Sequence, residues 1–168
     1  MSKAWLSLGS NLGNRQSYLA IAIRRLTEIA ESHVLTVSSL YATEPWGKKE
    51  QGEFLNAALF METTLSPLAL LDYCQSIETA AGRVRKEHWG SRTLDIDIIA
   101  YNDLTLGLPN LTLPHPYFAQ RRFVLMPLAE LDSPWGDTGL HSLQELLNSC
   151  PDDLCVKKLS SATVWWNK

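Results

Sequence analysis

The chain has 168 residues, of which 45% are hydrophobic and 20% charged, and its formal net charge is −3. This length suffices for one domain with a sizeable hydrophobic core, and the composition is ordinary for a globular protein. The slight negative charge excludes nucleic-acid binding driven by overall charge, but it does not exclude a local basic patch.

The cysteine content and the N-terminus bear on the cellular compartment. The three cysteines show no zinc-ligand spacing and are typical of free thiols in a reducing compartment. The apolar run at residues 4–8 is too short for a signal peptide or a membrane span. We therefore expect one cytoplasmic domain over residues 1–168, monomeric and without membrane or nucleic-acid partners.

The first half of the chain shows the periodicities of a strand, a helix and two further strands. Residues 4–8 predict a short strand, and we interpret the glycine-containing turn that follows as a connector, because one such turn is weak evidence for phosphate binding. Apolar residues at helical spacing predict an amphipathic helix over residues 15–31. Residues 33–41 and 54–61 predict strands. The long loop at residues 43–52 has the composition and length of a lid.

A second helix and a fourth strand follow. Ser66 and Pro67 provide a capping residue and a proline at the first helical position, and Gly82 ends the helix. Apolar and polar residues then alternate over residues 94–98, as in a half-buried strand. The order strand, helix, strand, strand, helix, strand is the split βαβ arrangement. We therefore predict an α+β fold with a ferredoxin-like βαββαβ core, a mainly antiparallel sheet and helices on both faces.

The last third of the chain adds shorter elements to this core. Apolar spacing predicts helices over residues 123–131 and 142–148. The tail at residues 150–168 has no clear period, so we predict no element there.

The fourth predicted strand carries two carboxylates on one face. Asp95 and Asp97 alternate with Leu94, Ile96 and Ile98, and side chains two apart on a strand lie roughly 7 Å from each other. Carboxylates at this spacing are suited to hold one or two hard divalent cations, and paired metals are common in phosphoryl transfer. The alternative is an ordinary solvent-facing strand, although aspartate is disfavoured in strands.

A basic loop precedes these carboxylates. Arg83, Arg85, Lys86 and Arg92 lie within ten residues of one another. An acidic pair beside such a loop indicates an Mg²⁺-polyphosphate site, with metal on one side and guanidinium groups on the other. The alternative is a solvated loop without a ligand.

Two further polar features are each open to two interpretations. Gln75 and Glu78 share one face of the second helix, which is either a solvated surface or part of a site. His115 lies between Pro114 and Pro116, where it either faces a ligand or fills a turn.

The sequence around these residues resembles one family, the 6-hydroxymethyl-7,8-dihydropterin pyrophosphokinases of folate biosynthesis. Residues 89–98 read W-G-S-R-T-L-D-I-D-I and are similar to the family signature W-G-P-R-T-x-D-x-D. The blocks that match in the same order are Gly9 to Gly13, Tyr41 and Thr43, Phe54 to Ala58, Glu78 with Gly82 and Arg83, and Pro114 to Pro116. Collinear blocks that span most of residues 4–131 are far more specific than any one of them.

The resemblance implies transfer of the pyrophosphoryl group of ATP to the hydroxymethyl oxygen of 6-hydroxymethyl-7,8-dihydropterin, with release of AMP. By the family pattern, Asp95 and Asp97 bind two Mg²⁺ ions, and Arg83 and Arg92 are catalytic. The residues that match the ATP site are Leu71, Gln75, Glu78, Arg85, Trp89, Ile98, Thr112, His115 and Arg121.

The resemblance also implies a pterin site. Phe54 and Phe123 match the aromatic pair that sandwiches the pterin ring, and Asn56 matches its hydrogen-bonding partner. Thr43, Pro45 and Trp46 are expected to close over it. A flat heteroaromatic ring gains from stacking between two aromatic faces, and its donor and acceptor edge suits an amide.

Two other functions remain as alternatives. One is an RNA-binding module on the same fold, which would require an aromatic RNP-like run that this sequence lacks. The other is a different Mg²⁺-dependent nucleotidyl- or phosphotransferase that uses the Asp95–Asp97 pair, and only Phe54, Asn56 and Phe123 argue against it.

Overall fold

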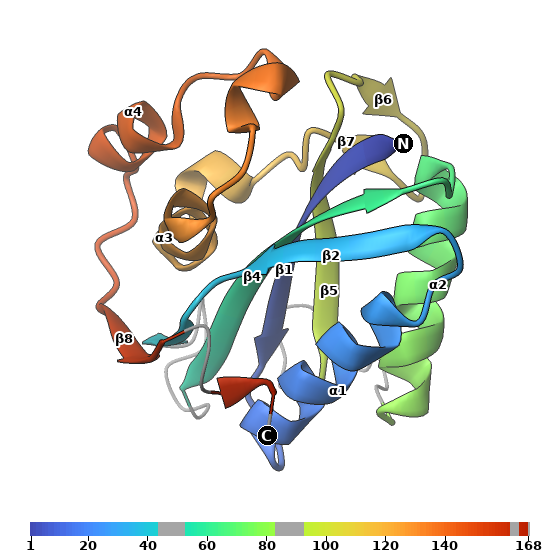
Figure 1. Cartoon of the computed structure of the whole chain (residues 1–168). Helices are drawn as coiled ribbons and strands as arrows, with labels where there is room; N and C mark the ends of the chain where they lie inside the picture. The colour runs from blue at the N-terminus through green and yellow to red at the C-terminus, as the bar shows by residue number, and fades with distance from the viewer. Residues whose placement is uncertain (44–52, 83–92, 162–164, 168) are drawn as a thin grey trace.

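The computed structural model describes residues 1–43, 53–82, 93–161 and 165–167. At its centre lies a sheet in the order β5-β1-β4-β3-β8, with antiparallel pairing throughout (Figure 1). β2 pairs with the C-terminal half of β4, and β3 with its N-terminal end. The strands of the sheet are β1 (Ser2–Ser10), β2 (Ser32–Val37), β3 (Leu40–Thr43), β4 (Phe54–Thr63), β5 (Asp95–Tyr101) and β8 (Val156–Ser160). A separate hairpin consists of β6 (Leu106–Gly107) and β7 (Thr112–Leu113).

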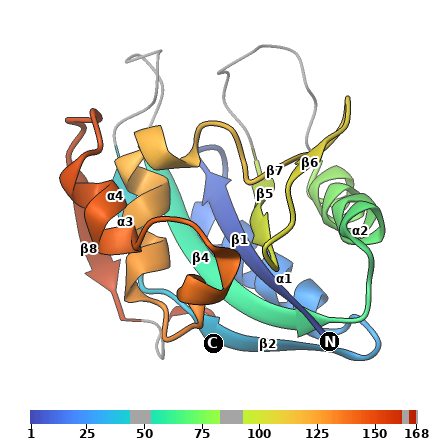
Figure 2. The ribbon, with the colours of Figure 1, turned by 90° about the horizontal axis from the view of Figure 1, so that it is seen from above.

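Helices cover both faces of the sheet (Figure 2). Asn14 and Ser66 cap the first two helices by accepting hydrogen bonds from backbone N–H groups one turn further on. The α-helices are α1 (Arg15–Thr27), α2 (Pro67–Ala80), α3 (Arg122–Glu130) and α4 (Leu143–Asn148), and the 3₁₀ turns are η1 (Phe118–Gln120) and η2 (Trp135–Thr138). Within the described ranges, no helix has the length and apolar character needed to cross a membrane.

The two faces of the sheet bury separate hydrophobic cores. Leu6, Leu8 and Ile98 pack with α1 and α2 in one core. Trp5 and Phe60 pack with α3 and α4 in the other. Since neighbouring residues of a strand point to opposite faces, β1 contributes to both cores. The predicted ferredoxin-like arrangement, with helices on both faces of a mainly antiparallel sheet, is therefore confirmed.

Several predicted elements have different bounds in the structure. The first strand, predicted over residues 4–8, is β1 (Ser2–Ser10), so Gly9 and Ser10 belong to the strand and not to the turn. The strand predicted over residues 33–41 is divided into β2 and β3. The break lies at Ser38, where the side-chain Oγ takes the place of a backbone carbonyl and accepts a hydrogen bond from Ala58 N at 2.8 Å. The helix predicted over residues 15–31 ends at Thr27, and the chain turns at Glu31, which has a φ of 52°.

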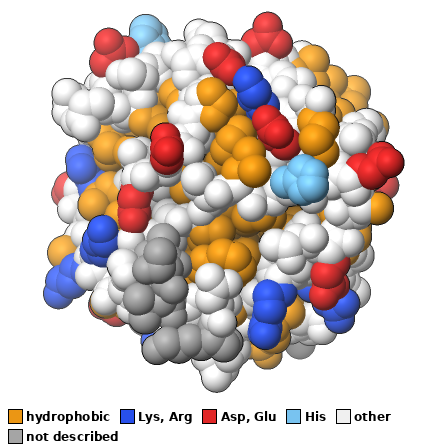
Figure 3. Space-filling model, viewed as in Figure 1, with side chains coloured by type: hydrophobic (Ala, Val, Ile, Leu, Met, Phe, Trp, Pro, Cys, Tyr) orange, Lys and Arg blue, Asp and Glu red, His pale blue; other side chains and the backbone are white. Residues whose placement is uncertain are grey.

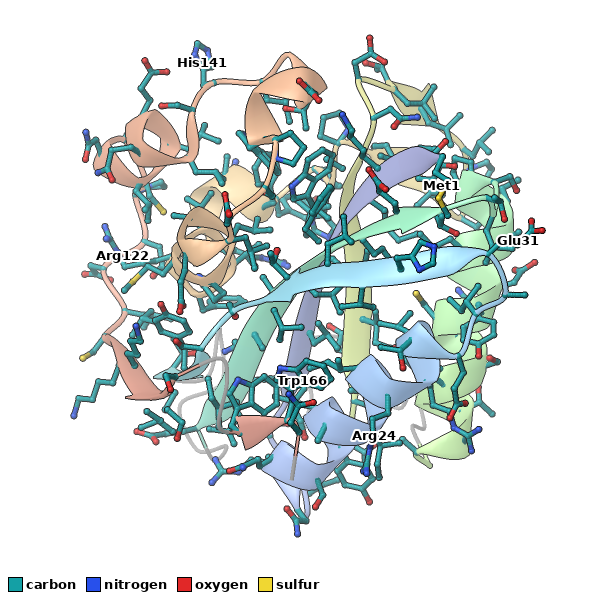
Figure 4. All side chains as sticks on the ribbon, viewed as in Figure 1. Met1, Arg24, Glu31, Arg122, His141 and Trp166 are labelled. Carbon is teal, nitrogen blue, oxygen red and sulfur yellow. The ribbon has the colours of Figure 1, made fainter. Side chains whose placement is uncertain are left out.

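The tail, for which the sequence predicted no element, packs on the rest of the fold. Its strand β8 pairs with β3 along what would otherwise be an open edge of the sheet. Trp165 is 2% exposed within the α1–α2 core, and its indole N–H donates to the Ser38 carbonyl at 3.0 Å. Its neighbour Trp166 lies beside α1 (Figure 4).

Candidate active site

Asp95 and Asp97 lie on the face of β5 that points away from α1 and α2. Ile96 and Ile98 point the other way and are buried under those helices, whereas both carboxylates are partly buried and the Asp97 side chain is 35% exposed. The predicted alternation along this strand is thus confirmed. Two half-open carboxylates on one face form an acidic surface that solvent or a ligand can reach.

His115 lies beside this acidic surface. Its backbone N–H donates to the Ile99 carbonyl at 2.8 Å, which fixes the residue against β5. Its Nε2 lies 3.9 Å from Asp97 Oδ2. Burial, followed by the positive charge of Arg121, lowers the pKa of His115 to about 4, although the negative charge of Asp95 opposes this shift. The ring is therefore neutral at pH 7, and its contact with Asp97 is not an ion pair.

The hydrogen bonds of His115 also define its tautomer. Its Nδ1 accepts a hydrogen bond from Tyr117 N at 3.2 Å. Because a neutral imidazole has one donor and one acceptor nitrogen, the ring hydrogen is on Nε2. The Nε2–H group therefore faces the acidic surface as a donor, and the role of His115 toward a ligand stays a prediction.

Arg121 lies among aromatic rings at the start of α3. Its guanidinium carbon is 5.4 Å from the centroid of the Tyr117 ring and 6.0 Å from that of the Phe123 ring. These distances are within the range of cation–π attraction, which holds a cation near aromatic faces without neutralising it. Arg121 thus brings positive charge to the side of the sheet that carries Asp95 and Asp97.

A buried amide lies two strands away from Asp95. Asn56 on β4 is 3% exposed, and its Nδ2 donates to Thr43 Oγ1 on β3. Gly9 on β1 pairs with Asn56 on one side and with Asp95 on the other. A Cβ at Gly9 would lie 3.0 Å from Asn56 Oδ1 and 3.8 Å from the Phe54 ring. The Asn56 side chain therefore packs too closely against β1 to leave room for a side chain at Gly9.

The two predicted pterin-binding aromatic residues belong to one side of the sheet. Phe54 shares a face of β4 with Asn56, two residues further on. Phe123 lies in the first turn of α3. It packs against the core that α3 and α4 form with the Asn56 face of β4. Their arrangement around a ring stays a prediction.

The α2 residues predicted for the nucleotide site have unequal exposure. Glu78 is 4% exposed, so the interpretation as a solvated helix surface is wrong for this residue. Gln75 and Leu71 are partly buried on the same helix. Burial of a glutamate on a helix is uncommon unless the carboxylate has a partner, and Glu78 is not without one.

The remaining predicted site residues divide into two groups. Thr112 is exposed on β7, whereas the Ile98 side chain is in the α1–α2 core, on the opposite face from the two carboxylates. Their roles in the nucleotide site stay predictions. Pro45, Trp46, Arg83, Arg85, Trp89 and Arg92 lie outside the described residues.

The donor set at the acidic surface suits a magnesium ion that shares its coordination with a substrate. The described residues contain no group of three or more His, Cys, Asp or Glu side chains with metal-site geometry. Mg²⁺ commonly binds to one or two carboxylates and completes its six oxygen ligands with water and substrate phosphates. Asp95 and Asp97 on a half-open face match that pattern.

Some residues of this region were missed by sequence reasoning. Gly9 was assigned to a connecting turn and to a block that matches the family, but to no role in the site, and no short-range signal could indicate its position between Asp95 and Asn56. Asp152 contacts the start of α3 from 30 residues away, a contact that only the folded chain creates.

Sequence comparisons identify relatives over most of the chain. The model of a family described as 7,8-dihydro-6-hydroxymethylpterin-pyrophosphokinase matches residues 5–133. A 2-amino-4-hydroxy-6-hydroxymethyldihydropteridine pyrophosphokinase of Methylorubrum extorquens is 45% identical over 131 residues, which are 78% of this chain and 83% of the relative. A relative of the same name from Haemophilus influenzae is 38% identical over 157 residues, 94% of this chain and 98% of the relative.

Structural comparison supports the fold. A crystal structure of a Plasmodium falciparum HPPK-DHPS triple mutant superimposes with a TM-score of 0.68 at 17% sequence identity, over 88% of this chain and 44% of that one. The wild-type protein gives a TM-score of 0.65 with the same coverage of each chain. The chain therefore spans less than half the length of these structures, and at such identity the likeness concerns the fold alone.

Proposed function

We propose that the Asp95–Asp97 face of β5 and the Asn56 side chain of β4 carry out pyrophosphoryl transfer from ATP to hydroxymethyldihydropterin, because the chain belongs to the 7,8-dihydro-6-hydroxymethylpterin-pyrophosphokinase family of folate biosynthesis. The family match over residues 5–133 argues against the RNA-binding alternative. On the face of the molecule that Figure 3 shows, the described Lys and Arg side chains are interspersed with Asp and Glu and form no continuous basic patch.

In this proposal Asp95 and Asp97 hold two Mg²⁺ ions together with the phosphates of ATP. When bound, these ions supply alignment and charge neutralisation for the triphosphate. A bound cation would favour the charged form of both carboxylates, so neither would be suited to act as the general base. The Nε2–H of His115 and the guanidinium of Arg121 would donate to phosphate oxygens from the adjacent loop.

The pterin ring would lie between Phe54 and Phe123. The amide nitrogen of Asn56 already donates to Thr43, so its carbonyl oxygen is the atom suited to accept hydrogen bonds from donors on the pterin edge. A side chain at Gly9 would crowd that oxygen, which lies 3.0 Å from the position of a Cβ there. Pro45, Trp46, Arg83, Arg85, Trp89 and Arg92 keep the roles that the resemblance implies for them.

One observation carries the proposal: Asp95, Gly9 and Asn56 stand in register on three adjacent strands. Neighbouring strands are about 4.8 Å apart, so the metal-binding and pterin-binding positions are separated by about 10 Å. That separation suits a pyrophosphoryl group that bridges the two substrates. Holding both reactants in alignment is the main contribution a protein makes to phosphoryl transfer.

The experiment that tests this function is a product analysis. The protein is incubated with ATP, Mg²⁺ and 6-hydroxymethyl-7,8-dihydropterin, with chelator in a parallel reaction. We expect AMP and the pterin diphosphate in a one-to-one ratio, and only with metal. Formation of ADP would mean transfer of a single phosphoryl group and would overturn the proposal. ATP consumption that continues with the chelator would overturn the metal assignment.

A further inference from the structure

The start of helix α3 carries residues of both proposed binding sites. Arg121 immediately precedes the helix and Phe123 is its second residue. Arg122, between them, is the first residue with helical geometry. A shift of this helix end would therefore displace the guanidinium proposed for ATP and the ring proposed for the pterin at the same time.

The local sequence at this helix end is unsuited to begin a helix. The capping position is occupied by Arg121, which makes no side-chain capping hydrogen bond. A guanidinium has no acceptor atom, so it cannot satisfy the free N–H groups of a first helical turn. Two adjacent arginines also place positive charge at the positive end of the helix dipole. The helix start therefore needs an acceptor from elsewhere in the chain.

Asp152 supplies that acceptor from the C-terminal tail. Its Oδ2 accepts a hydrogen bond from Arg122 N at 2.9 Å, and its carbonyl oxygen accepts one from Arg122 Nε at 3.2 Å. Its Oδ1 accepts from Leu154 N at 2.9 Å, which fixes the orientation of the carboxylate. Asp152 is 6% exposed. A buried carboxylate in this position provides the missing cap and the missing negative charge.

The tail itself is anchored to the sheet, so Asp152 is held from the other side. The chain between α4 and β8 runs alongside α3 (Figures 1 and 2), and the side chain of Arg122 lies beside it (Figure 4). Four residues after Asp152 the tail enters β8, which pairs with β3. Lys158 on β8 lies 3.6 Å from Glu130 at the other end of α3. The tail therefore contacts both ends of the helix.

We propose that Asp152 is a positioning residue for both substrates, because it fixes the end of α3 from which Arg121 and Phe123 reach the site. This inference rests on the proposed function of that site. It extends the binding apparatus beyond residues 5–133, the part of the chain that the family model matches. The tail thereby has a role in ligand binding although its own residues need not touch a ligand.

The test compares four variants with the wild-type protein. Asp152→Ala removes both carboxylate oxygens, and Asp152→Asn retains one side-chain oxygen as an acceptor. Ser142→Ala is the matched control, because it removes the side-chain cap of α4, where Ser142 Oγ accepts from Glu145 N at 3.1 Å. Phe123→Ala reports directly on the pterin site.

Calorimetry measures two dissociation constants for each variant. One is that of 6-hydroxymethyl-7,8-dihydropterin, and the other is that of Mg²⁺ with α,β-methylene-ATP, an analogue whose α–β bridge cannot be cleaved in the transfer. Thermal unfolding measures the stability of each variant.

We expect Asp152→Ala to raise both dissociation constants by about 5-fold or more, the scale of one lost helix cap. Asp152→Asn should give a smaller increase, which also keeps the test valid if the alanine variant does not fold. Ser142→Ala should leave both constants within about twofold of wild type at a similar loss of stability. If both Asp152 variants bind like the control, the inference is wrong. If Phe123→Ala also leaves pterin binding unchanged, it is the proposed site that is wrong.

Discussion

At the scale of single residues, the candidate site depends on small atomic differences. Gly9 is required because a Cβ there would approach Asn56 Oδ1 to 3.0 Å. His115 is a neutral donor because Tyr117 N occupies its Nδ1 and burial lowers its pKa to about 4. Neither the need for glycine at residue 9 nor the neutral state of His115 follows from residue type alone. Each depends on neighbours that the fold brings close.

Asp97→Asn should reduce turnover by about 100-fold or more, the scale for loss of one preorganised group that stabilises charge. The Asp97 side chain is 35% exposed, so the variant should unfold at nearly the wild-type temperature. Steady-state kinetics with a magnesium titration, together with thermal unfolding, measures both quantities. Near-normal turnover at saturating magnesium would contradict the metal assignment.

Gly9→Ala should weaken pterin binding by roughly 10-fold or more, as expected for one misplaced carbon in a fitted pocket. The added Cβ would displace the Asn56 amide and contact the Phe54 ring, without touching the proposed nucleotide residues of α2. Binding of Mg²⁺ with α,β-methylene-ATP should change much less.

Gly107→Ala is the matched control for this substitution, because a Cβ at Gly107 would meet nothing within 4 Å. Calorimetry on both variants separates the pterin and nucleotide constants. Equal pterin affinities in the two variants would mean that the space beside Asn56 is not where the pterin binds.

At the scale of elements, one carboxylate joins helix α3 to strand β3. Glu130 Oε2 accepts hydrogen bonds from Ser39 N at 3.0 Å and from Tyr41 Oη at 2.7 Å, and Oε1 accepts from Ser39 Oγ. Burial by itself would raise the pKa of Glu130, but the hydrogen bonds from Ser39 and Tyr41 and the charge of Lys158 outweigh it and lower the pKa. The ionised form therefore stabilises the contact between the two elements.

Glu130→Gln should lower the free energy of unfolding at pH 7 by about 1–3 kcal/mol, because an amide turns one donor toward groups that need acceptors. The lowered pKa of Glu130 means that its contribution is complete above its ordinary value of 4.5 and is lost as the pH falls through the folded-state value. The difference between wild type and variant should therefore shrink below about pH 4.5. Urea unfolding from pH 7 to pH 3 measures it, and a difference that stays constant over this range would refute the assignment.

At the scale of the whole molecule, the C-terminal tail is part of the fold. It adds β8 to the sheet, caps α3 through Asp152 and inserts Trp165 into the core under α1. The carbonyl of Trp165 also accepts a hydrogen bond from Gln16 Nε2 at 3.2 Å. Removal of the tail would therefore expose apolar surface and an edge strand as well as release a helix end.

Trp165→Ala should destabilise the protein by about 3–5 kcal/mol and lower its melting temperature by roughly 6–20 °C, because it leaves a large cavity in the core. Leu159→Ala is the control on the same tail, since Leu159 is 53% exposed and should cost little. Calorimetric melting of both variants measures the difference. Similar melting temperatures would mean that the tail does not contribute to the core in solution.

The sequence by itself determined the βαββαβ core, the family and the alternation that puts Asp95 and Asp97 on one face, because these depend on periodicity and on motifs within short stretches. It did not determine the division of residues 33–41 into two strands, since that break depends on a bond between Ser38 and Ala58. The alignment of Asp95, Gly9 and Asn56, the burial of Glu78 and the cap from Asp152 were decided only by the tertiary structure. The reason is physical: the strand register and the cap join residues far apart in the chain, and burial depends on what packs over a side chain, so local propensity contains no information about either.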